Sequence, residues 1–401
     1  MYMEVEILKF DDLGRGIGYL NGKIIFVPKS CPGDYLLVKI VLEKKNFYVG
    51  LIEEIIKPSK LRKDVPCPYF FKCGGCDLMH LSVSEQLDYK LNKTNEMLLK
   101  NNIHFPVEKI IKSEKSLAYR NKVTFKVKNG IIGYYEPRTH DLIKIDECLL
   151  CKEEINNFLH DLPMFGIMNG EIVVRTNYKQ ELLVHIITSD EVKNIKQLVN
   201  LHKIVGVVKN DECIYGDDFF IDKVNDLSFK VSYNSFFQIN PTINKQIFNL
   251  LSQFTKNSKN IIDLYSGVGT LSIASYQTDA HILGVEIVEN AVLDASLNKL
   301  LNNKKDIEFI CADTSEVIDK ITSDFDTIIL DPPRSGVTKE ILMKIMNENI
   351  KNIIYISCDQ STLVRDLLLL MDNYEIQEFI LLDMFSNTKH VESFVVLKSK
   401  N

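Results

Sequence analysis

The chain has 401 residues, 45% hydrophobic and 25% charged, which is the composition of an ordinary folded protein. No apolar run approaches the roughly 18 residues of a membrane span, and the opening MYMEVEILKF resembles neither a signal peptide nor a transit peptide, so we expect no membrane association. The formal charge of −6 gives no overall sign of a nucleic-acid partner, and the length fits two or three domains.

The first segment, residues 1–57, consists of short apolar runs separated by turn residues. VEILKF, KIIFV, YLLVKIVL and FYVGLIEEII alternate with GRGIG, PGD and a Lys-Lys-Asn turn. Runs of this length, rich in β-branched and aromatic residues and broken by glycine, proline and asparagine, are typical of short strands. The segment therefore predicts a small β-barrel.

The second segment, residues 58–229, begins with a linker of prolines and basic residues that leads into a group of closely spaced cysteines. Strand patterns run from residue 119 to about residue 226, and turns such as the one at residues 128–130 favour hairpins. We expect a mainly antiparallel β domain.

A helix is predicted over residues 84–101, within a basic stretch of the same segment. Residues 85–130 hold ten Lys or Arg against five Asp or Glu, a balance that would suit a nucleic acid. The simpler interpretation is that Lys90, Lys93 and Lys100 form the solvent-exposed side of an amphipathic helix.

The third segment, residues 230–401, alternates helical stretches with short, continuously apolar runs such as NIIDLY, HILGVEI, FDTIILD and KNIIYIS. This alternation predicts βαβ units and a parallel sheet covered by helices. The whole chain is thus expected to be a multidomain α/β protein.

Nine cysteines are present, and three of them fall within ten residues of the second segment. Such spacing indicates metal or catalytic chemistry in a reducing compartment, so we expect a cytoplasmic protein. Four thiolates would suit zinc as well as an iron–sulfur cluster. The closely spaced set is Cys67, Cys73 and Cys76, with Cys148 further along the chain.

A glycine-containing turn from Asp263 to Thr270, DLYSGVGT, lies where an apolar strand leads into a helix. Glu286 ends the next strand about 20 residues later, where a carboxylate suits ribose hydroxyls. These residues fit NAD and S-adenosylmethionine equally well, but the missing third glycine and the lack of a basic phosphate cradle favour a ligand without pyrophosphate. A tight turn with a solvent-exposed glutamate is the alternative.

Two further strand ends carry reactive side chains, in Asp331-Pro-Pro-Arg334 and in Ile356-Ser-Cys358. Both would line the carboxyl edge of the sheet, where open α/β folds hold their ligands, and Arg334 would favour the thiolate of Cys358. Glu392, before the final apolar run, would reach the same crevice as a general base, although a glutamate at a strand start is more often only solvent-exposed.

In their order along the chain, these motifs resemble those of the RNA 5-methyluridine (uracil-C5) methyltransferases. The resemblance spans nearly the whole chain, and the opening barrel resembles the TRAM domain, an RNA-binding barrel of OB type. The branch with both a TRAM barrel and iron–sulfur cysteines, which acts mainly on 23S ribosomal RNA, is the most similar. The matching motifs are CPYFFKCGGC at 67–76, FFQIN at 236–240, DLYSGVGT, DPPRSG, ISC at 356–358 and HVE at 390–392.

The resemblance implies a C-terminal Rossmann-like class I methyltransferase domain that methylates carbon 5 of a uridine in RNA. We expect 23S ribosomal RNA as the substrate, with transfer RNA as the alternative, and a monomeric enzyme. Cys358 would be the nucleophile that adds to carbon 6 of uracil, and Glu392 would be the base. The residues implied around S-adenosylmethionine are Gln238, Tyr265, Thr270, Glu286, Asp313 and Asp331.

The resemblance also implies a [4Fe-4S] cluster on Cys67, Cys73, Cys76 and a distant fourth cysteine. Alignment favours Cys148 as the fourth, but Cys151 lies close by and leaves the choice open. Relatives usually carry Pro-His-Thr where this chain has Ser-Asn-Thr at 386–388, a departure that would affect loop geometry and leave the catalytic pair in place.

Two other functions fit part of the same pattern. A Rossmann dehydrogenase with a redox cluster would explain the glycine turn and Glu286, but it leaves DPPRSG and Cys358 unexplained. A non-catalytic RNA-binding iron–sulfur protein would explain only the barrel, the cysteines and the basic stretch.

Overall fold

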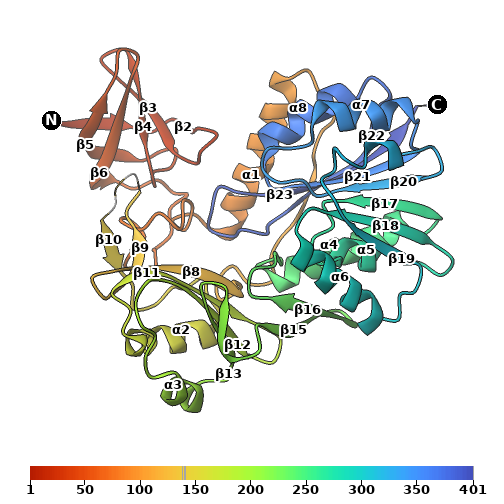
Figure 1. The fold of residues 1–401 in the computed structure, drawn as a ribbon. Coiled ribbons are helices and arrows are strands. Elements are labelled where there is room, and N and C mark those ends of the chain that lie inside the picture. Colours follow the sequence, from red (N-terminus) through yellow and green to blue (C-terminus); the bar gives the residue numbers. More distant parts are fainter. Residues whose placement is uncertain (138, 140, 401) are drawn as a thin grey trace.

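The structure is a computed structural model that describes residues 1–137, 139 and 141–400. Figure 1 shows an N-terminal barrel and a central sheet on one side of the molecule and a C-terminal α/β domain on the other. Residue 401, the last of the predicted third segment, lies outside the described residues. Within the described ranges, no helix combines the length and apolar character needed to cross a bilayer.

The N-terminal sheet forms the small barrel that the first segment predicts. Its opening strands β1 (Tyr2–Glu6) and β2 (Lys9–Phe10) pair respectively with β5 (Tyr35–Glu43) and β3 (Gly16–Leu20). Because residues 2–10 bridge the two edges in this way, the sheet closes on itself around an aliphatic core. The remaining strands are β4 (Lys23–Val27) and β6 (Phe47–Lys57).

The central sheet is mainly antiparallel, as predicted, with β12 and β13 as its parallel pair. On the third strand across the sheet, Val123, Phe125 and Val127 pack against helices, while Thr124 and Lys126 line a cavity on the opposite face. This alternation is the period of a strand with two different faces. In order, the strands are β10 (Leu142–Lys144), β9 (Ile131–Tyr135), β8 (Lys122–Lys128), β11 (Asn169–Thr176), β12 (Leu182–Ile187), β13 (Ile204–Lys209) and β14 (Glu212–Gly216).

Three short helical elements cover the apolar face of the central sheet: α2 (Glu153–Leu159), η1 (Leu162–Phe165) and α3 (Ile195–Leu201). A hairpin of β15 (Phe219–Val224) and β16 (Leu227–Ser232) then leads to the C-terminal domain and packs into its core.

The C-terminal sheet begins with five parallel strands, as predicted. One reversed strand, β23, follows at the other side and pairs antiparallel with both of its neighbours, and the apolar pattern did not reveal its direction because buried strands look alike either way. Across the sheet, the order is β19 (Ile307–Cys311), β18 (His281–Glu286), β17 (Asn260–Leu264), β20 (Thr327–Leu330), β21 (Asn352–Ser357), β23 (Glu392–Ser399), β22 (Tyr374–Leu382) and β7 (Lys109–Ile111).

Helices cover both faces of this sheet and complete two apolar cores. One core contains residues of α1 (Val83–Lys100), α7 (Lys339–Asn347) and α8 (Gln360–Leu370). The other contains residues of α4 (Pro241–Phe254), α5 (Thr270–Ser275) and α6 (Glu289–Leu301). The short η2 (Ile318–Lys320) lies between β19 and β20 along the chain. The layers are those of a doubly wound α/β domain.

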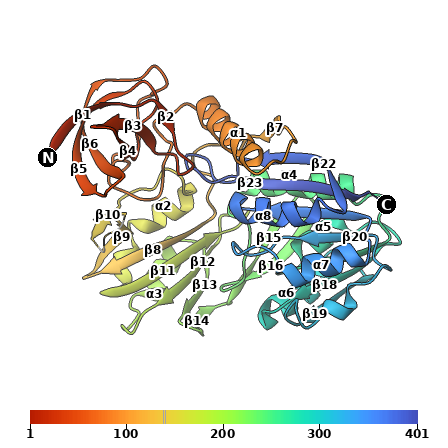
Figure 2. The ribbon, with the colours of Figure 1, turned by 90° about the horizontal axis from the view of Figure 1, so that it is seen from above.

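Part of the second segment belongs to this C-terminal domain. The predicted helix is present as α1, and β7, which follows it, pairs in parallel with β22. Figure 2 shows α1 between the barrel and the C-terminal sheet. The interpretation of three lysines as its solvent-exposed side is wrong for Lys90, whose side chain is 0% exposed and lies against Asp383.

The barrel is joined to the cysteine segment through a buried carboxylate, Asp34. Its oxygens accept hydrogen bonds from the guanidinium of Arg62 at 2.8 and 2.9 Å and from the amides of Cys31 and Ser59. Burial alone would raise the pKa of Asp34, but the hydrogen bonds outweigh it and lower the pKa below its ordinary value. Asp34 thus fixes the linker at residues 59–62 on the barrel.

Asp34→Asn should destabilise the protein by roughly 3–5 kcal/mol at neutral pH, because it leaves Arg62 without its buried partner. Since the folded pKa is depressed, this contribution is complete above the ordinary aspartate pKa of about 3.9 and is lost as pH falls through the folded pKa. Urea unfolding at several pH values measures the difference, with the exposed Asp12→Asn as control. A deficit that stayed constant from neutral to strongly acidic pH would contradict the assignment.

Candidate active site

The glycine turn after β17 holds the carboxylate of Glu286 at the end of β18. One oxygen of Glu286 accepts from the amide of Gly267 and the other from the amide of Val288, both at 2.9 Å. Both strands are parallel neighbours, so their carboxyl ends meet at one edge of the sheet. The predicted partnership of turn and glutamate is therefore present, and Glu286 is fixed in direction.

At two positions near this turn, the ring of Phe309 leaves no room for any side chain, so only glycine fits. A Cβ on Gly269, which has a φ of +79°, would lie 2.6 Å from the ring of Phe309, and a Cβ on Gly284 would lie 2.4 Å from it. Gly267 also has a positive φ, but a Cβ there would meet nothing within 4 Å. The turn thus leaves open space at Gly267, on the side where a ligand would approach.

Two carboxyl groups lie at neighbouring strand ends, the buried Asp263 near the end of β17 and the partly buried Asp331 after β20. Burial raises the pKa of each to about 7, and Asp263 is further affected by its hydrogen bond with Ser272 and by Asp331. One oxygen of Asp263 has no hydrogen-bond partner among the described residues. Such perturbed groups in a crevice are typical of functional sites.

Cys358 and Glu392 are brought together by strand pairing. β21 and β23 are antiparallel neighbours, and their register places Ser357 opposite Ser393. Cys358 follows the first serine and Glu392 precedes the second, so the two residues come side by side at the edge of the sheet. The two strand ends, 34 residues apart in sequence, are thereby combined into one site.

The electrostatics of Cys358 differ from the sequence-based expectation. Burial, together with the carboxyls of Glu392 and Asp331, raises the pKa of the Cys358 thiol to about 11. Arg334 acts in the expected direction and hydrogen-bonds the sulfur, but its effect is smaller. In the state that the structure describes, Cys358 is therefore a neutral thiol rather than a thiolate.

Glu392 is a buried carboxyl group, with 3% of its surface exposed. Burial and the nearby Asp331 raise its pKa well above the ordinary value. The alternative that Glu392 is a solvent-exposed residue at a strand start is therefore wrong. A carboxyl with a raised pKa beside a thiol has the properties of a general base or acid.

Of the remaining predicted ligand-binding residues, three lie at this edge of the sheet, and the fourth, Gln238, makes its contact elsewhere. Tyr265 has a φ of +68°, and its hydroxyl contacts Thr314 close to Asp313. Thr270 begins α5, and Asp313 follows β19 with its carboxylate bonded to Ser315. Gln238 is half-buried, and its backbone carbonyl accepts a hydrogen bond from the side-chain amide of Asn121. The structure thus does not join the Gln238 side chain to the others.

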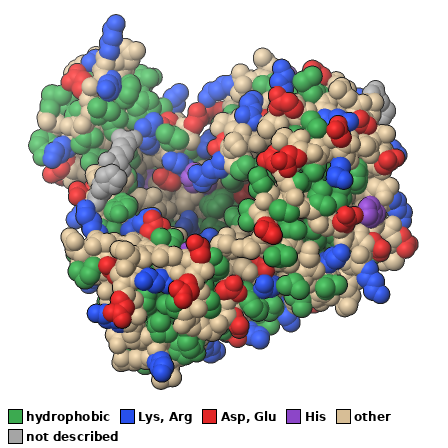
Figure 3. All heavy atoms as spheres, in the orientation of Figure 1, with side chains coloured by type: hydrophobic (Ala, Val, Ile, Leu, Met, Phe, Trp, Pro, Cys, Tyr) green, Lys and Arg blue, Asp and Glu red, His purple; other side chains and the backbone are tan. Residues whose placement is uncertain are grey.

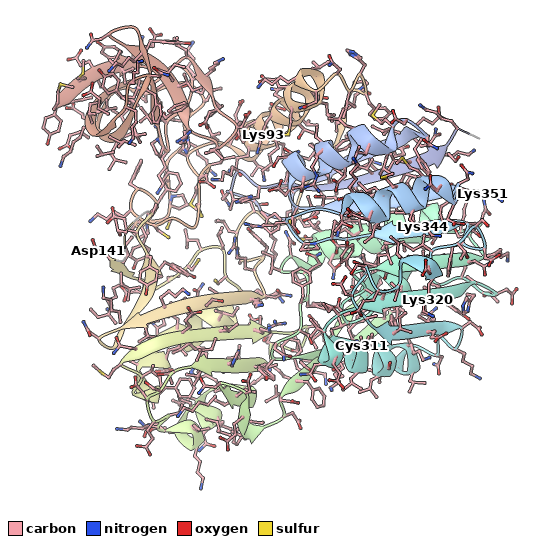
Figure 4. All side chains as sticks on the ribbon, turned by 45° about the horizontal axis from the view of Figure 1, so that its top comes forward. Lys93, Asp141, Cys311, Lys320, Lys344 and Lys351 are labelled. Carbon is pink, nitrogen blue, oxygen red and sulfur yellow. The ribbon has the colours of Figure 1, made fainter. Side chains whose placement is uncertain are left out.

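A cavity of about 370 Å³ opens beside Cys358. Figure 3 shows the hollow between the barrel, the central sheet and the C-terminal domain, with Lys and Arg side chains around it. Lys93 lies on the part of α1 next to this hollow (Figure 4). Among the cavity residues that sequence reasoning missed are the basic Arg120 and Lys389 and the acidic Asp77, which carry no motif signal of their own. Basic side chains at a concave surface suit a phosphate backbone.

The predicted cluster cysteines line a second cavity, of about 340 Å³. Lys29 on the barrel donates to the carbonyls of Phe70 and Cys73 and so holds this loop. In the described part of the chain, no three Cys, His, Asp or Glu side chains are arranged as ligands of one metal ion. The donor set itself fits a metal cluster, since the four thiols face one largely apolar cavity. They are Cys67, Cys73, Cys76 and Cys148.

The two candidates for the fourth cysteine are placed differently. Cys148 lines the cavity, whereas Cys151 is 1% exposed and belongs to the apolar core of the central domain. Arg120, Gly74 and Gly75 line both this cavity and the one beside Cys358. The cysteine loop therefore forms a wall shared by the two cavities.

The loop at residues 383–391, which contains the Ser-Asn-Thr departure, is held by hydrogen bonds around Asn387. Asn387 has a φ of +66°, a conformation that asparagine tolerates better than most residues. Its side chain bonds to Gln86 and to the carbonyl of Ser116, and its carbonyl accepts from the amides of Asp77 and Leu78. The substitution is thus accommodated within a hydrogen-bonded loop.

Comparisons with known proteins match both ends of the chain. The sequence model of the tRNA (Uracil-5-)-methyltransferases matches residues 82–400, and that of the TRAM domain matches residues 2–49. Relatives named as RNA methyltransferases from Halalkalibacterium halodurans and Bacillus cereus are each 32% identical. They align over 100% and 97% of this chain and over 97% and 95% of their own lengths.

Among solved structures, the chain is similar to the Pyrococcus abyssi tRNA (uracil-54, C5)-methyltransferase in complex with S-adenosyl-L-homocysteine. The two share 28% identity and a TM-score of 0.82 over 98% of this chain and 99% of that one. Both comparisons agree with the barrel, the α/β domain and the crevice described above. The chain therefore belongs to the S-adenosylmethionine-dependent RNA (uracil-5-)-methyltransferase family, and its N-terminal barrel is a TRAM domain.

Proposed function

We propose that this enzyme methylates carbon 5 of a uridine in 23S ribosomal RNA through a covalent bond between Cys358 and carbon 6 of uracil. The observation that carries the covalent route is the antiparallel register that sets Cys358 beside Glu392. Hydride transfer by a dehydrogenase does not require a thiol beside a carboxyl. Binding of RNA without catalysis does not explain why the two groups are buried together.

S-adenosylmethionine supplies, when bound, a methyl group on a sulfonium centre. Glu286 would bind the ribose hydroxyls, since its carboxylate is held at the strand end by Gly267 and Val288. The open space at Gly267 leaves room for the ligand beside the turn. The other residues proposed to surround it are Gln238, Tyr265, Thr270, Asp313 and Asp331.

Cys358 starts the reaction from a neutral thiol, whose proton passes to solvent in the cavity when the substrate is in place. Its sulfur adds to carbon 6 of uracil, and the electron pair of the 5,6 double bond moves toward carbon 5 and O4 as an enolate. Carbon 5 thereby becomes nucleophilic enough to accept a methyl group. Arg334 stabilises the negative sulfur before it adds.

Glu392 completes the reaction by removing the proton of carbon 5. The electrons of that bond restore the 5,6 double bond, and the bond between carbon 6 and Cys358 breaks. Burial favours this role, because the raised pKa of Glu392 makes its carboxylate a stronger base than an exposed one. The target base must first leave its stack, and the cavity beside Cys358 offers it space.

A [4Fe-4S] cluster held by Cys67, Cys73, Cys76 and Cys148 is part of the proposal. The support is the convergence of four thiols on one apolar cavity and the exclusion of Cys151 from its lining. The cluster would hold the shared wall between the two cavities in place.

The choice of ribosomal RNA rests on the combination of the TRAM barrel with this cysteine set. Transfer RNA is the second candidate, favoured by the likeness to the Pyrococcus abyssi tRNA (uracil-54, C5)-methyltransferase.

Cells that lack the gene should lose 5-methyluridine at one or more positions of 23S ribosomal RNA and keep it in transfer RNA. Mass-spectrometric mapping of both RNAs measures this, with re-expression of the wild type and of Cys358→Ala as controls. If 5-methyluridine were lost only from transfer RNA, transfer RNA would be the substrate. If neither RNA lost it, the enzyme would not methylate uridine C5 in these RNAs.

Cys358→Ala should abolish methylation and leave cofactor affinity nearly unchanged, because only the nucleophile is lost. Glu392→Gln should still add to the base and methylate it, but should stall before elimination, so that protein–RNA adducts accumulate. Denaturing gels with a labelled methyl donor detect both outcomes, and RNA with 5-fluorouridine should trap the wild type.

The exposed Cys213→Ala on β14 is the matched control and should behave like the wild type. If Cys358→Ala still methylated RNA, Cys358 would not be the nucleophile. If Glu392→Gln turned over normally, the base would instead be Asp331 or a water molecule.

Anaerobically purified protein should contain about four irons per chain and absorb visible light. Cys148→Ser should lose this iron and Cys151→Ser should keep it, because Cys148 lines the cavity and Cys151 does not. Iron and sulfide analysis measures both. Zinc in place of iron would contradict the cluster, and the reverse pattern of the two variants would reassign the fourth ligand.

A further inference from the structure

A stripe of buried polar side chains runs along α1. Gln86, Lys90 and Thr94 are spaced by four residues and so share one helix face. Their exposed fractions are 2%, 0% and 2%, which is unusual for a lysine. Over these three turns the helix therefore presents polar groups to the domain, and the apolar core begins one turn later at Leu98.

The first two residues of the stripe contact the loop that precedes Glu392. The amide nitrogen of the Gln86 side chain donates to Asn387 at 3.1 Å, and its oxygen accepts from the backbone amide of Asn387 at 2.8 Å. The ammonium of Lys90 donates to Asp383 at 2.5 Å and to the carbonyl of Phe385 at 3.2 Å. Residues 383–391 join β22 to the start of β23, where Glu392 lies.

The third residue of the stripe contacts the segment that follows Cys358. The hydroxyl of Thr94 donates to the carbonyl of Lys90 at 2.8 Å and accepts from the side-chain amide of Gln360. Gln360 is the first residue of α8, two positions after Cys358. One helix thus contacts both chain segments that carry the catalytic pair, at different points along its length.

From this arrangement we infer that the Gln86–Lys90–Thr94 stripe positions the two catalytic groups independently, Lys90 and Gln86 acting on Glu392 and Thr94 acting on Cys358. The inference rests on the proposed function, since it assigns the two contacts to the two halves of the covalent reaction. These three are positioning residues, because none of them lies among the reacting groups.

Physical chemistry favours a directional role for the stripe over a purely stabilising one. A buried ion pair gains little over well-packed apolar side chains, because removing two charges from water offsets most of their attraction. Apolar residues would therefore attach α1 to the domain at least as well. Polar groups add fixed hydrogen-bond directions, which hold a loop in one conformation.

Lys90→Met removes the ammonium and keeps a long apolar side chain, so the loop at 383–391 should lose its anchor. Removal of the carbon 5 proton should slow by about tenfold, the factor that corresponds to 1.4 kcal/mol. Rapid-quench experiments with a labelled methyl donor and target RNA should then show accumulation of the methylated protein–RNA adduct. Thr94→Val, which replaces the hydroxyl with a methyl group of similar size, should instead slow adduct formation, with no accumulation.

Lys100→Met is the matched control, because Lys100 lies on the same helix and is exposed. Asp383→Asn provides a second way to break the contact with Lys90 if Lys90→Met does not fold. Melting temperatures and cofactor affinities of all variants show whether the domain itself is intact.

The inference holds if the Lys90 or Asp383 variant raises the ratio of adduct to product while Thr94→Val does not. It is overturned if the folded Lys90 and Asp383 variants keep the ratio of adduct to product found for Lys100→Met. It is also overturned if these variants and Thr94→Val slow adduct formation and proton removal equally, as a general loss of stability would. A failure of the proposed function looks different, because the wild type would then form no adduct with 5-fluorouridine RNA.

Discussion

The buried ion pair between Lys90 and Asp383 is the contact that fixes the direction in which α1 docks on the C-terminal domain. It joins α1, near the start of the second segment, to the end of β22 in the C-terminal sheet. β7 then adds to the edge of that sheet before the chain enters the central domain. Because a charge without its partner would be costly in this interior, the helix has one way to dock.

Docking in this way also fixes the cysteine loop. The carbonyl of Asn387 accepts from the amides of Asp77 and Leu78, which follow the last closely spaced cysteine. The barrel holds the same loop from the other side through Lys29. Three parts of the chain that are distant in sequence therefore meet around one hollow, and the wall between its two cavities is made of the glycines at 74 and 75 and of Arg120.

Local patterns explain which features could be predicted from the sequence. Glu286 and Cys358 each follow an apolar run, and strand ends in a parallel sheet share an edge, so their place was predictable. Lys90 was mistaken for a surface residue because its partner lies 293 residues away and leaves no local signal. The neutral state of Cys358 was missed because its largest cause is burial, which depends on packing between distant segments, with the carboxyls of Glu392 and Asp331 adding to it. The contribution of β7 to the C-terminal sheet likewise depends on a distant strand.

The antiparallel register of β21 and β23 limits how this site can vary among related sequences. Side chains alternate between the two faces of a strand, so an insertion of one residue between Glu392 and Ser393 would turn the carboxyl to the opposite face of the sheet. Length changes within residues 383–391 would not reverse this alternation, but they would disturb the contacts of Asp383 and Asn387 with α1. One-residue insertions after Glu392 should therefore be absent from related sequences, because they alone turn the carboxyl away from Cys358.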